Sequence, residues 1–250
     1  MATPDAITAP KTGLSETDVP EAQRLANLIE AQNKAAALFA DVERDMIRPG
    51  VSEKELTDAI YKLGKEKYNV RTHWHRRLVR SGPHTLAMFN DNTDDRVIEA
   101  DDILYVDLGP VFEAYEADFG RTYVLGNDPN KIALRDALEP LWYAIKAEFD
   151  ARPDITGEEL YDIAVRLTKE AGEKSGLGWK YGNVFCGHLV GDFPHERIPR
   201  DMITLYMTTG NHLPVRTLNA KGQQRHWILE IYLRDEERGY AGFYEQILTV

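Results

Sequence analysis

Residues 103–125 read ILYVDLGPVFEAYEADFGRTYVL, and this stretch decides the fold class. Two runs within it, residues 103–111 and 115–125, are rich in β-branched and aromatic side chains and predict two neighbouring strands. Each run is interrupted by an acid, Asp107 in the first and Asp118 in the second. A buried carboxylate is costly unless it is paired, protonated or bound to a cation. The two acids are therefore the first candidates for function.

The same conflict between an acid and its apolar surroundings recurs near the C-terminus. Glu230 interrupts the run WILEIY at 227–232, and Glu245 interrupts FYEQIL at 243–248. The midpoint between the two glutamates falls within the turn-like stretch DEERG at 235–239. In a hairpin with that turn they would face each other on neighbouring strands, with Cβ atoms about 5 Å apart.

The same midpoint rule applies to Asp107 and Asp118. The midpoint between Asp107 and Asp118 falls between Phe112 and Glu113, which predicts that these acids also face each other unless a bulge at residues 109–110 shifts the register. Like charges so close together repel, and cations between them would relieve the repulsion. Two-metal hydrolases hold their ions about 3.5–4 Å apart, a spacing that bridging carboxylates suit. One acid alone would be explained as an edge-strand ion pair or a solvated side chain, whereas two matched pairs favour a metal site.

Two histidines extend the candidate site. His188 lies in CGHLVG at 186–191, where the glycines let the backbone approach a ligand closely. His195 follows seven residues later, in PHERIP at 194–199. A lone histidine is more often a structural residue than a ligand, so these two gain weight only beside the four acids.

Composition limits the classes of function. The chain has 250 residues, a single cysteine and a formal net charge of −11, from 30 Lys and Arg against 41 Asp and Glu. This charge argues against an overall basic surface for nucleic acid. No run approaches the roughly 18 apolar residues of a membrane span, and the N-terminal residues lack a signal-peptide pattern. We therefore expect a cytoplasmic protein with neither a nucleic-acid nor a membrane partner.

The order of the predicted elements indicates the class of fold. Helical periodicity and capping residues predict four helices, over residues 20–46, 52–68, 127–149 and 156–174. Further strands are expected over 203–208, 226–233 and 240–250, and the glycine-rich stretch 176–191 is expected to be a loop. This order predicts an α+β fold with an antiparallel sheet.

The sequence also predicts a simple domain organisation. We expect a flexible N-terminal arm over residues 1–12 and a single catalytic domain over residues 13–250. The amphipathic first helix offers a surface for a homodimer, although packing on its own sheet would explain that helix equally well.

Taken together, these residues resemble the pita-bread metallopeptidase family M24, which includes methionine aminopeptidases, Xaa-Pro aminopeptidases and creatinase. VDLG at 106–109 and EADFGRT at 116–122 are similar to the segments that carry the family's first two aspartates. The segment 187–199 is similar to its glycine–histidine and histidine–glutamate motifs. Glu230 and Glu245 stand where the family has its last two acidic ligands, so all five ligand positions match in type and order.

The resemblance covers roughly residues 80–250 and implies a fold, a cofactor and a chemistry. The fold is the pita-bread fold, a curved antiparallel sheet flanked by helices. The cofactor is a pair of divalent ions, bound by Asp107, Asp118, His188, Glu230 and Glu245. This mostly carboxylate ligand set suits Mn, Fe, Co or Zn, with Mn favoured. The chemistry is attack of a metal-bridged hydroxide on an amide or peptide carbonyl.

The resemblance also implies a role for each residue. Asp107 would bind one ion, and His188 with Glu230 would bind the other. Asp118 and Glu245 would bridge both. The catalytic residues would be Glu230, which carries the proton from the water to the leaving nitrogen, and His195, which stabilises the oxyanion.

Departures from the family's pattern concern the substrate. The turn SGP at 81–83 is similar to the Xaa-Pro and creatinase branch, but the histidine with which that branch contacts its substrate falls on Phe89. His84, or a histidine of the segment 73–75, is a candidate to take its place. The proline that follows the family's fourth ligand is replaced by Ile231.

A basic cluster lies just before the SGP turn and consists of Arg71, Arg76, Arg77 and Arg80. Arg76 and Arg77 are the candidates to bind a substrate carboxylate through paired hydrogen bonds. The alternative is that the cluster balances nearby acids, namely Asp91, Asp94 and Asp95. Together with Phe89, the cluster favours a small anionic substrate.

Three functions therefore stay open. The first is a dinuclear hydrolase that resembles Xaa-Pro aminopeptidases and acts on a small peptide. The second is a metalloenzyme of the same fold that acts on a small anionic metabolite by non-peptidase hydrolysis or lysis. The third is a non-catalytic binding module, which ranks last because all five ligand positions are filled.

Overall fold

The structure, a computed structural model, describes residues 19–198 and 201–250. The predicted N-terminal arm, residues 1–12, lies outside the described residues. Within them the chain forms four helices, namely α1 (Glu21–Asp45), α2 (Glu53–Tyr68), α3 (Pro129–Ala151) and α4 (Gly157–Ser175). All four were predicted from the sequence to within two residues at either end. The division into an arm and one catalytic domain stays a prediction.

Antiparallel strands form two sheets in the described part of the chain. The strands are β1 (Val70–His73), β2 (Leu78–Ser81), β3 (Ile103–Leu108), β4 (Pro110–Phe112), β5 (Tyr115–Glu116), β6 (Phe119–Val124), β7 (Lys180–Tyr181), β8 (Phe185–Val190), β9 (Tyr206–Thr208), β10 (His226–Asp235) and β11 (Tyr240–Ile247). The large sheet has the order β2-β3-β6-β11-β10-β8-β9, with β7 also paired to β10, and the small sheet has the order β1-β4-β5. The predicted antiparallel α+β class is confirmed.

Local side-chain chemistry explains where the helices begin. At the start of α2 the Ser52 hydroxyl accepts a hydrogen bond from the Glu55 backbone, and the Glu55 carboxylate accepts one from the Ser52 backbone. Thr156 and Glu159 make the same reciprocal capping box at α4. These bonds satisfy backbone donors that a helix leaves unpaired at its N-terminus.

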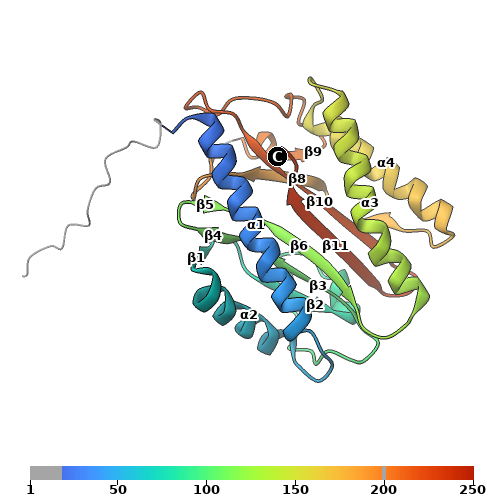
Figure 1. The fold of residues 1–250 in the computed structure, drawn as a ribbon. Coiled ribbons are helices and arrows are strands. Elements are labelled where there is room, and N and C mark those ends of the chain that lie inside the picture. Colours follow the sequence, from blue (N-terminus) through green and yellow to red (C-terminus); the bar gives the residue numbers. More distant parts are fainter. Residues whose placement is uncertain (1–18, 199–200) are drawn as a thin grey trace, which may run out of the picture.

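The helices cover one face of the large sheet. In Figure 1, α1 and α2 lie over one end of this sheet and α3 and α4 over the other. Leu104, Val106 and Leu108 alternate along β3 and pack with Leu38 and Phe39 of α1. Because successive side chains of a strand point to opposite faces, the residues between these apolar ones face away from the helices.

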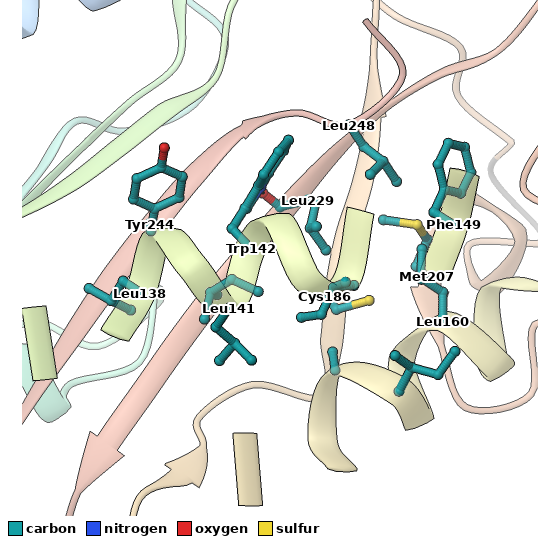
Figure 2. Packing of buried hydrophobic residues seen from close by; sticks show 14 of the residues in the cluster. Leu138, Leu141, Trp142, Phe149, Leu160, Cys186, Met207, Leu229, Tyr244 and Leu248 are labelled. Atoms are coloured by element: carbon teal, nitrogen blue, oxygen red, sulfur yellow. The ribbon is translucent and has the colours of Figure 1, made fainter. Parts of the chain in front are cut away.

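The second half of the core lies under α3 and α4. Trp142 of α3 is fully buried, and its indole N–H donates a 2.8 Å hydrogen bond to the Leu229 carbonyl of β10. Figure 2 shows Leu138, Trp142 and Phe149 of α3 together with Leu229 of β10, Tyr244 of β11 and Leu248, which follows β11. This packing makes the sheet a rigid support for whatever lies on its other face.

Two predicted segments differ from the structure. The stretch 176–191 is not only a loop, because β7 and β8 lie within it. The glycines of this stretch are typical of a loop, so the sequence did not predict β8. This strand is held by pairing with β9 and β10. Of the strand predicted over 203–208, only β9 forms, and a short 3-10 helix (Ile203–Leu205) precedes it. None of the helices in the described ranges has the length and apolar character to cross a membrane.

Candidate metal centre

Three acids and a glycine form a row across the middle of the large sheet. Asp107 on β3 pairs with Gly120 on β6, Gly120 with Glu245 on β11, and Glu245 with Glu230 on β10. The predicted register of Glu230 opposite Glu245 is confirmed. All three carboxylates are buried. The glycine is needed because a Cβ at position 120 would lie 2.5 Å from the ring of Phe243.

The predicted register of the other pair is wrong, because Asp107 faces Gly120 rather than Asp118. After β3 the chain turns out of the large sheet, and β4 pairs with β1 and β5 instead. The turn between β4 and β5 lies at residues 113–114, where Glu113 has a φ of 54°. The centre of the hairpin is thus one residue later than expected. Asp118 still shares the face of Asp107, because it lies two residues from Gly120.

Two histidines contact these carboxylates. Nε2 of His188, on β8, lies 3.3 Å from Asp118 Oδ2 and 3.7 Å from Glu245 Oε1. Nε2 of His75, between β1 and β2, lies 3.1 Å from Asp118 Oδ1 and 3.6 Å from Asp107 Oδ1. The two oxygens of Asp118 therefore face different imidazoles. His75 with the two aspartates, and His188 with Asp118 and Glu245, form two groups whose ligand atoms lie within 4.8 Å of one another.

Without a cation, the charges in this cluster conflict. Burial raises the pKa of Asp107 to about 7 and the pKa of Glu245 well above its usual range. Burial lowers the pKa of His188, but hydrogen bonds with Asp118 and Glu245 outweigh it and raise that pKa well above the usual value. Burial likewise opposes protonation of His75, yet Asp118 and Asp107 raise its pKa to about 9. Protons thus balance the charge that cations would otherwise balance.

Glu230 is held by a neighbour that the sequence did not reveal. The side-chain amide of Asn183 donates a 2.6 Å hydrogen bond to Glu230 Oε1. Burial raises the pKa of Glu230 to about 8, against the lowering effects of His188 and of the Asn183 hydrogen bond. Among the described residues, the two groups of closely spaced ligand atoms do not include Glu230. Its carboxyl group lies beside them, where a group that accepts and returns a proton is useful.

His195 is oriented by a buried acid. Its Nδ1 donates a 2.8 Å hydrogen bond to Glu116 Oε2, and the backbone N–H groups of Gly191 and His195 donate to the same carboxylate at 3.2 Å. Because Nδ1 carries the hydrogen of this bond, Nε2 is free for another partner. The ring of Trp74 stands edge to face at 5.2 Å from the rings of both His195 and His188. Glu116 and Trp74 therefore restrict how the two imidazoles can turn.

The candidate ligands and most of their neighbours line one cleft of about 790 Å³. It contains the five predicted ligands, His195, His75 and Asn183. Much of the remaining wall is apolar and includes Met88, Phe89, Val184, Phe185 and Leu205. A cleft of this size and character, with a few converging polar groups, is typical of a site for a small ligand.

Two of the predicted substrate-binding residues lie at this cleft or its rim. Phe89 lines the cleft, with its ring centre 5.8 Å from that of His75. The guanidinium of Arg76 lies 5.8 Å from the centre of the Phe89 ring and donates to the Asp91 carbonyl at 3.4 Å. Arg76 is therefore near the entrance but outside the lining.

The other two predicted substrate-binding residues point elsewhere. The guanidinium of Arg77 lies 4.5 Å from the centre of the Tyr61 ring. His84 Nδ1 lies 3.0 Å from Glu53 Oε2, in a cluster that also holds Ser81. Neither Arg77 nor His84 is among the described residues that line the cleft.

Sequence reasoning missed the roles of His75, Asn183 and Glu116 at this site. The sequence offers His75 only as one histidine of the segment 73–75 that is a candidate for the family's substrate contact, and it offers Glu116 only as part of a motif. A signal for Glu116 exists, since it is a further acid within the apolar run 115–125. Asn183 has no such signal, because a polar residue in a glycine-rich stretch is expected in any loop.

The residues present fit a pair of divalent cations. Four buried carboxylates and two imidazoles supply oxygen and nitrogen ligands of the kind that Mn, Fe, Co and Zn accept. Asp107 Oδ1 is buried, and within the described ranges no donor forms a hydrogen bond to it. A buried carboxylate oxygen without a donor is costly, and a cation would remove that cost.

Known sequences resemble this chain over most of its length. The profile of metallopeptidase family M24 matches residues 26–221. The Xaa-Pro dipeptidase of Pyrococcus furiosus is 31% identical over 169 residues, which are 64% of this chain and 43% of the relative. Methionine aminopeptidase 1 of Saccharomyces cerevisiae is 26% identical over 163 residues, which are 62% of this chain and 39% of the relative. The chain thus spans less than half the length of these relatives.

Solved structures resemble the fold. The X-Pro aminopeptidase from Thermotoga maritima matches 93% of this chain and 62% of its own, with a TM-score of 0.66 and 19% identity. The recombinant prolidase from Thermococcus sibiricus matches 93% of this chain and 60% of its own, with a TM-score of 0.67 and 18% identity. At these identities the likeness concerns the fold, and it confirms the predicted pita-bread architecture.

Proposed function

The chain belongs to metallopeptidase family M24, and from this premise we propose that it is a dinuclear metal-dependent hydrolase of the aminopeptidase type. The observation that carries the proposal is the convergence of four buried carboxylates and His188 on one cleft. So many acids in one buried place, with an oxygen that lacks a donor, favour bound cations over a purely structural role.

The ligand assignment follows the family pattern. Asp107 would hold one ion, His188 and Glu230 would hold the other, and Asp118 and Glu245 would be shared by both. For Asp118 the bridging role is supported by its two oxygens, which face His75 and His188 respectively. The carboxylate-rich ligand set favours Mn, with Fe, Co and Zn as the other candidates.

Bound divalent ions would supply a water of lowered pKa and an electrophile for the substrate carbonyl. Glu230 takes the proton of the attacking water and delivers it to the leaving nitrogen, a role that its position beside both groups of ligands supports. With Nδ1 donating to Glu116, the doubly protonated ring of His195 would donate from Nε2 to the oxygen of the tetrahedral intermediate. Apolar side chains around the cleft reduce the access of bulk water.

The favoured substrate is a short peptide with proline in the second position. The support is that relatives such as that of Pyrococcus furiosus carry the name Xaa-Pro dipeptidase. The cleft is large enough for such a peptide.

A second candidate keeps the metals and changes the substrate to a small anionic metabolite, cleaved by a non-peptidase route. Phe89 favours it, because an apolar ring lines the cleft where the family's Xaa-Pro branch would have a substrate-contacting histidine. Arg76 beside that ring offers a cation near the entrance.

One experiment tests the proposal and ranks the two candidates. The purified chain is stripped of metal, reloaded with Mn(II), and assayed with Xaa-Pro dipeptides beside N-acyl and carboxylate-bearing metabolites. Turnover that depends on added metal supports a metallohydrolase, and the substrate panel decides which class. A chain that binds no divalent ion, or turns over no member of either class, contradicts the proposal.

A homodimer and a cytoplasmic location stay predictions. The apolar stripe of α1 packs on this chain's own sheet, with Leu38 and Phe39 buried there, so dimer contacts must come from other surfaces. Light scattering at assay concentrations measures the mass directly, and a monomer would contradict the dimer.

A further inference from the structure

His75 is not one of the five ligands assigned above, yet its imidazole lies among them. It belongs to the segment that joins β1 to β2, far in sequence from His188 and the two glutamates. Its side chain is 8% exposed, and its ring lines the cleft beside Phe89. The question is what a buried imidazole does beside two carboxylates.

The segment of His75 is attached to the chain close to both aspartates. The backbone N–H of Trp74 donates a 2.9 Å hydrogen bond to the Gly109 carbonyl, which follows Asp107 by two residues. The indole N–H of Trp74 donates to the carbonyl of Ala117, the residue before Asp118, at 3.2 Å. A Cβ at Gly109 would lie 2.2 Å from Cδ2 of His75, so this close approach requires glycine there. His75 is thus held against the aspartates by the fold itself.

The distances suit two atoms bound to one ion. Nε2 of His75 lies 3.1 Å from Asp118 Oδ1 and 3.6 Å from Asp107 Oδ1. Two ligand atoms about 2.1 Å from the same ion are about 3.0 Å apart at a right angle and about 3.4 Å apart at the tetrahedral angle. A divalent ion between these three atoms would need only small movements of the side chains.

The hydrogen bond of the other nitrogen of His75 leaves Nε2 available to a cation. Nδ1 lies 2.6 Å from the Arg76 carbonyl oxygen, which can only accept, so Nδ1 carries a hydrogen. In the neutral imidazole Nε2 is then a lone pair directed at two carboxylate oxygens that are themselves acceptors. One of these, Asp107 Oδ1, has no donor among the described residues. Three acceptors that converge in a buried place need either a proton on Nε2 or a cation between them, and a bound ion would take the place of that proton.

His188 shows the same arrangement at the other group of ligands. Its Nδ1 lies 3.0 Å from the Leu189 carbonyl oxygen, and its Nε2 faces Asp118 and Glu245. Metal-binding histidines commonly donate from their second nitrogen to a backbone carbonyl, which fixes the tautomer and the ring. His75 and His188 are therefore equivalent in chemistry, on opposite sides of Asp118.

We propose that His75 is a sixth protein ligand, which binds through Nε2 the ion held by Asp107 and Asp118. This inference rests on the proposed dinuclear site and extends it, since each ion then has one imidazole and a share of the carboxylates. An imidazole ligand shifts the expected preference of that ion from Mn towards Fe, Co or Zn. The alternative role for His75 is contact with the substrate rather than with the metal. The experiments below distinguish the two roles.

Metal stoichiometry and affinity test the proposal. The wild-type chain, His75→Ala and the volume-conserving His75→Gln are stripped of metal and titrated with Co(II) by calorimetry, with bound metal counted by mass spectrometry. His73→Ala is the matched control, because His73 lies two residues away with its ring 6.1 Å from that of Tyr61 and outside the lining of the cleft. We expect two ions in wild type and control, and an affinity for one of the two that falls by at least about tenfold in both His75 variants.

A measurement on the wild type alone covers the case in which the variants do not fold. The chain is labelled with ¹⁵N-histidine and loaded with Mn(II), and electron-spin-echo modulation counts the imidazole nitrogens bound to metal. We expect two, from His75 and His188, and a count of one overturns the inference.

The possible results distinguish failure of the sixth-ligand inference from failure of the proposed function. If the wild type binds no divalent ion, both fail. If the wild type binds two ions and the His75 variants keep both at unchanged affinity, the inference fails and the proposed function stands. In that case a raised KM in the variants would assign His75 to the substrate. If only the His75 variants lose one ion, both are supported.

Discussion

Asn183, in the loop before β8, donates a 2.6 Å hydrogen bond to the carboxylate of Glu230 on β10, which is 47 residues further along the chain. Glu230 also has its backbone carbonyl fixed, because the Tyr181 hydroxyl donates to it at 2.7 Å. Tyr181 and Asn183 thus fix both the backbone and the side chain of Glu230, the residue that we propose to transfer the proton. The orientation of such a carboxylate matters because proton transfer requires hydrogen-bond distance to the reacting group.

The first prediction follows from this hydrogen bond. Asn183→Ala should lower kcat by about 10–100-fold, because the Glu230 carboxylate loses the partner that orients it. The value of KM should change little, since Asn183 acts through Glu230. Steady-state kinetics with the best substrate of the panel measures both constants. Val184→Ala is the matched control, because Val184 is the next residue, lines the cleft and is exposed. An unchanged kcat in Asn183→Ala would exclude the positioning role.

The second prediction concerns the bridging acids. Asp118→Ala and Glu245→Ala should each remove both ions, because each is assigned to both. Asp107→Ala should remove one ion and leave the other. Metal content after dialysis is measured by mass spectrometry, with far-UV circular dichroism to show that each variant is folded. Full occupancy in both bridging variants would overturn the assignment.

The third prediction separates metal binding from turnover. His195→Ala should keep both ions and lower kcat by about 10²–10⁴-fold, because the group that stabilises the oxyanion is lost. His212→Ala is the control, since that side chain is 80% exposed and pairs with Glu158. Loss of metal from His195→Ala would place His195 among the ligands instead.

The fourth prediction concerns the stability of the metal-stripped protein against pH. The pKa of Glu230 rises from 4.5 to about 8 and that of Asp107 from 3.8 to about 7, so the folded state binds more protons than the unfolded state in those windows. Stability therefore falls as pH rises through them. His75 acts in the same direction, since its pKa rises from 6.5 to about 9 and its contribution, present below 6.5, is lost as pH rises through 9.

Thermal melts at several values between about pH 6 and about pH 9 measure this dependence. We expect the Tm of the stripped protein to fall across that range and the fall to be smaller with Mn(II) bound, because ions replace the protons. A Tm that rises with pH in the stripped protein contradicts the prediction.

The fifth prediction concerns the substrate. If the substrate is a small anion, Arg76→Ala should raise KM by about tenfold, the effect expected from losing one charge-assisted hydrogen bond. Arg77→Ala should have little effect, because Arg77 lies over Tyr61 away from the cleft. Efficient cleavage of Xaa-Pro dipeptides that neither variant affects would exclude the anionic substrate and favour the peptide.

Phe89→His gives a second test of the substrate class. It introduces a histidine at the position where the Xaa-Pro branch has its substrate contact, so it should raise activity on Xaa-Pro dipeptides if the missing histidine limits peptide cleavage. Phe89→Leu is the control for loss of the ring. Equal peptide activity in Phe89→His and the wild type would show that Phe89 does not define the substrate class.

The sequence by itself determined the four helices and most strands, and it singled out the five residues that we propose as ligands. Helices follow from local periodicity and capping, as at Ser52 and Thr156, and these act over a few residues. The four acids among them stood out because an acid in an apolar strand needs an explanation wherever the strand lies. The register of Glu230 opposite Glu245 was also local, since one tight turn joins β10 to β11.

Only the tertiary structure decided what depends on distant segments. The hairpin that carries Asp107 and Asp118 turns at residues 113–114, one residue later than predicted. Its tip leaves the large sheet, and β4 pairs with β1, about 40 residues earlier in the chain. His75 reaches the aspartates through the hydrogen bonds of Trp74 to the carbonyls that follow Asp107 and precede Asp118. Local patterns carry no information on such contacts, because their energy comes from groups that meet only when the sheets have formed.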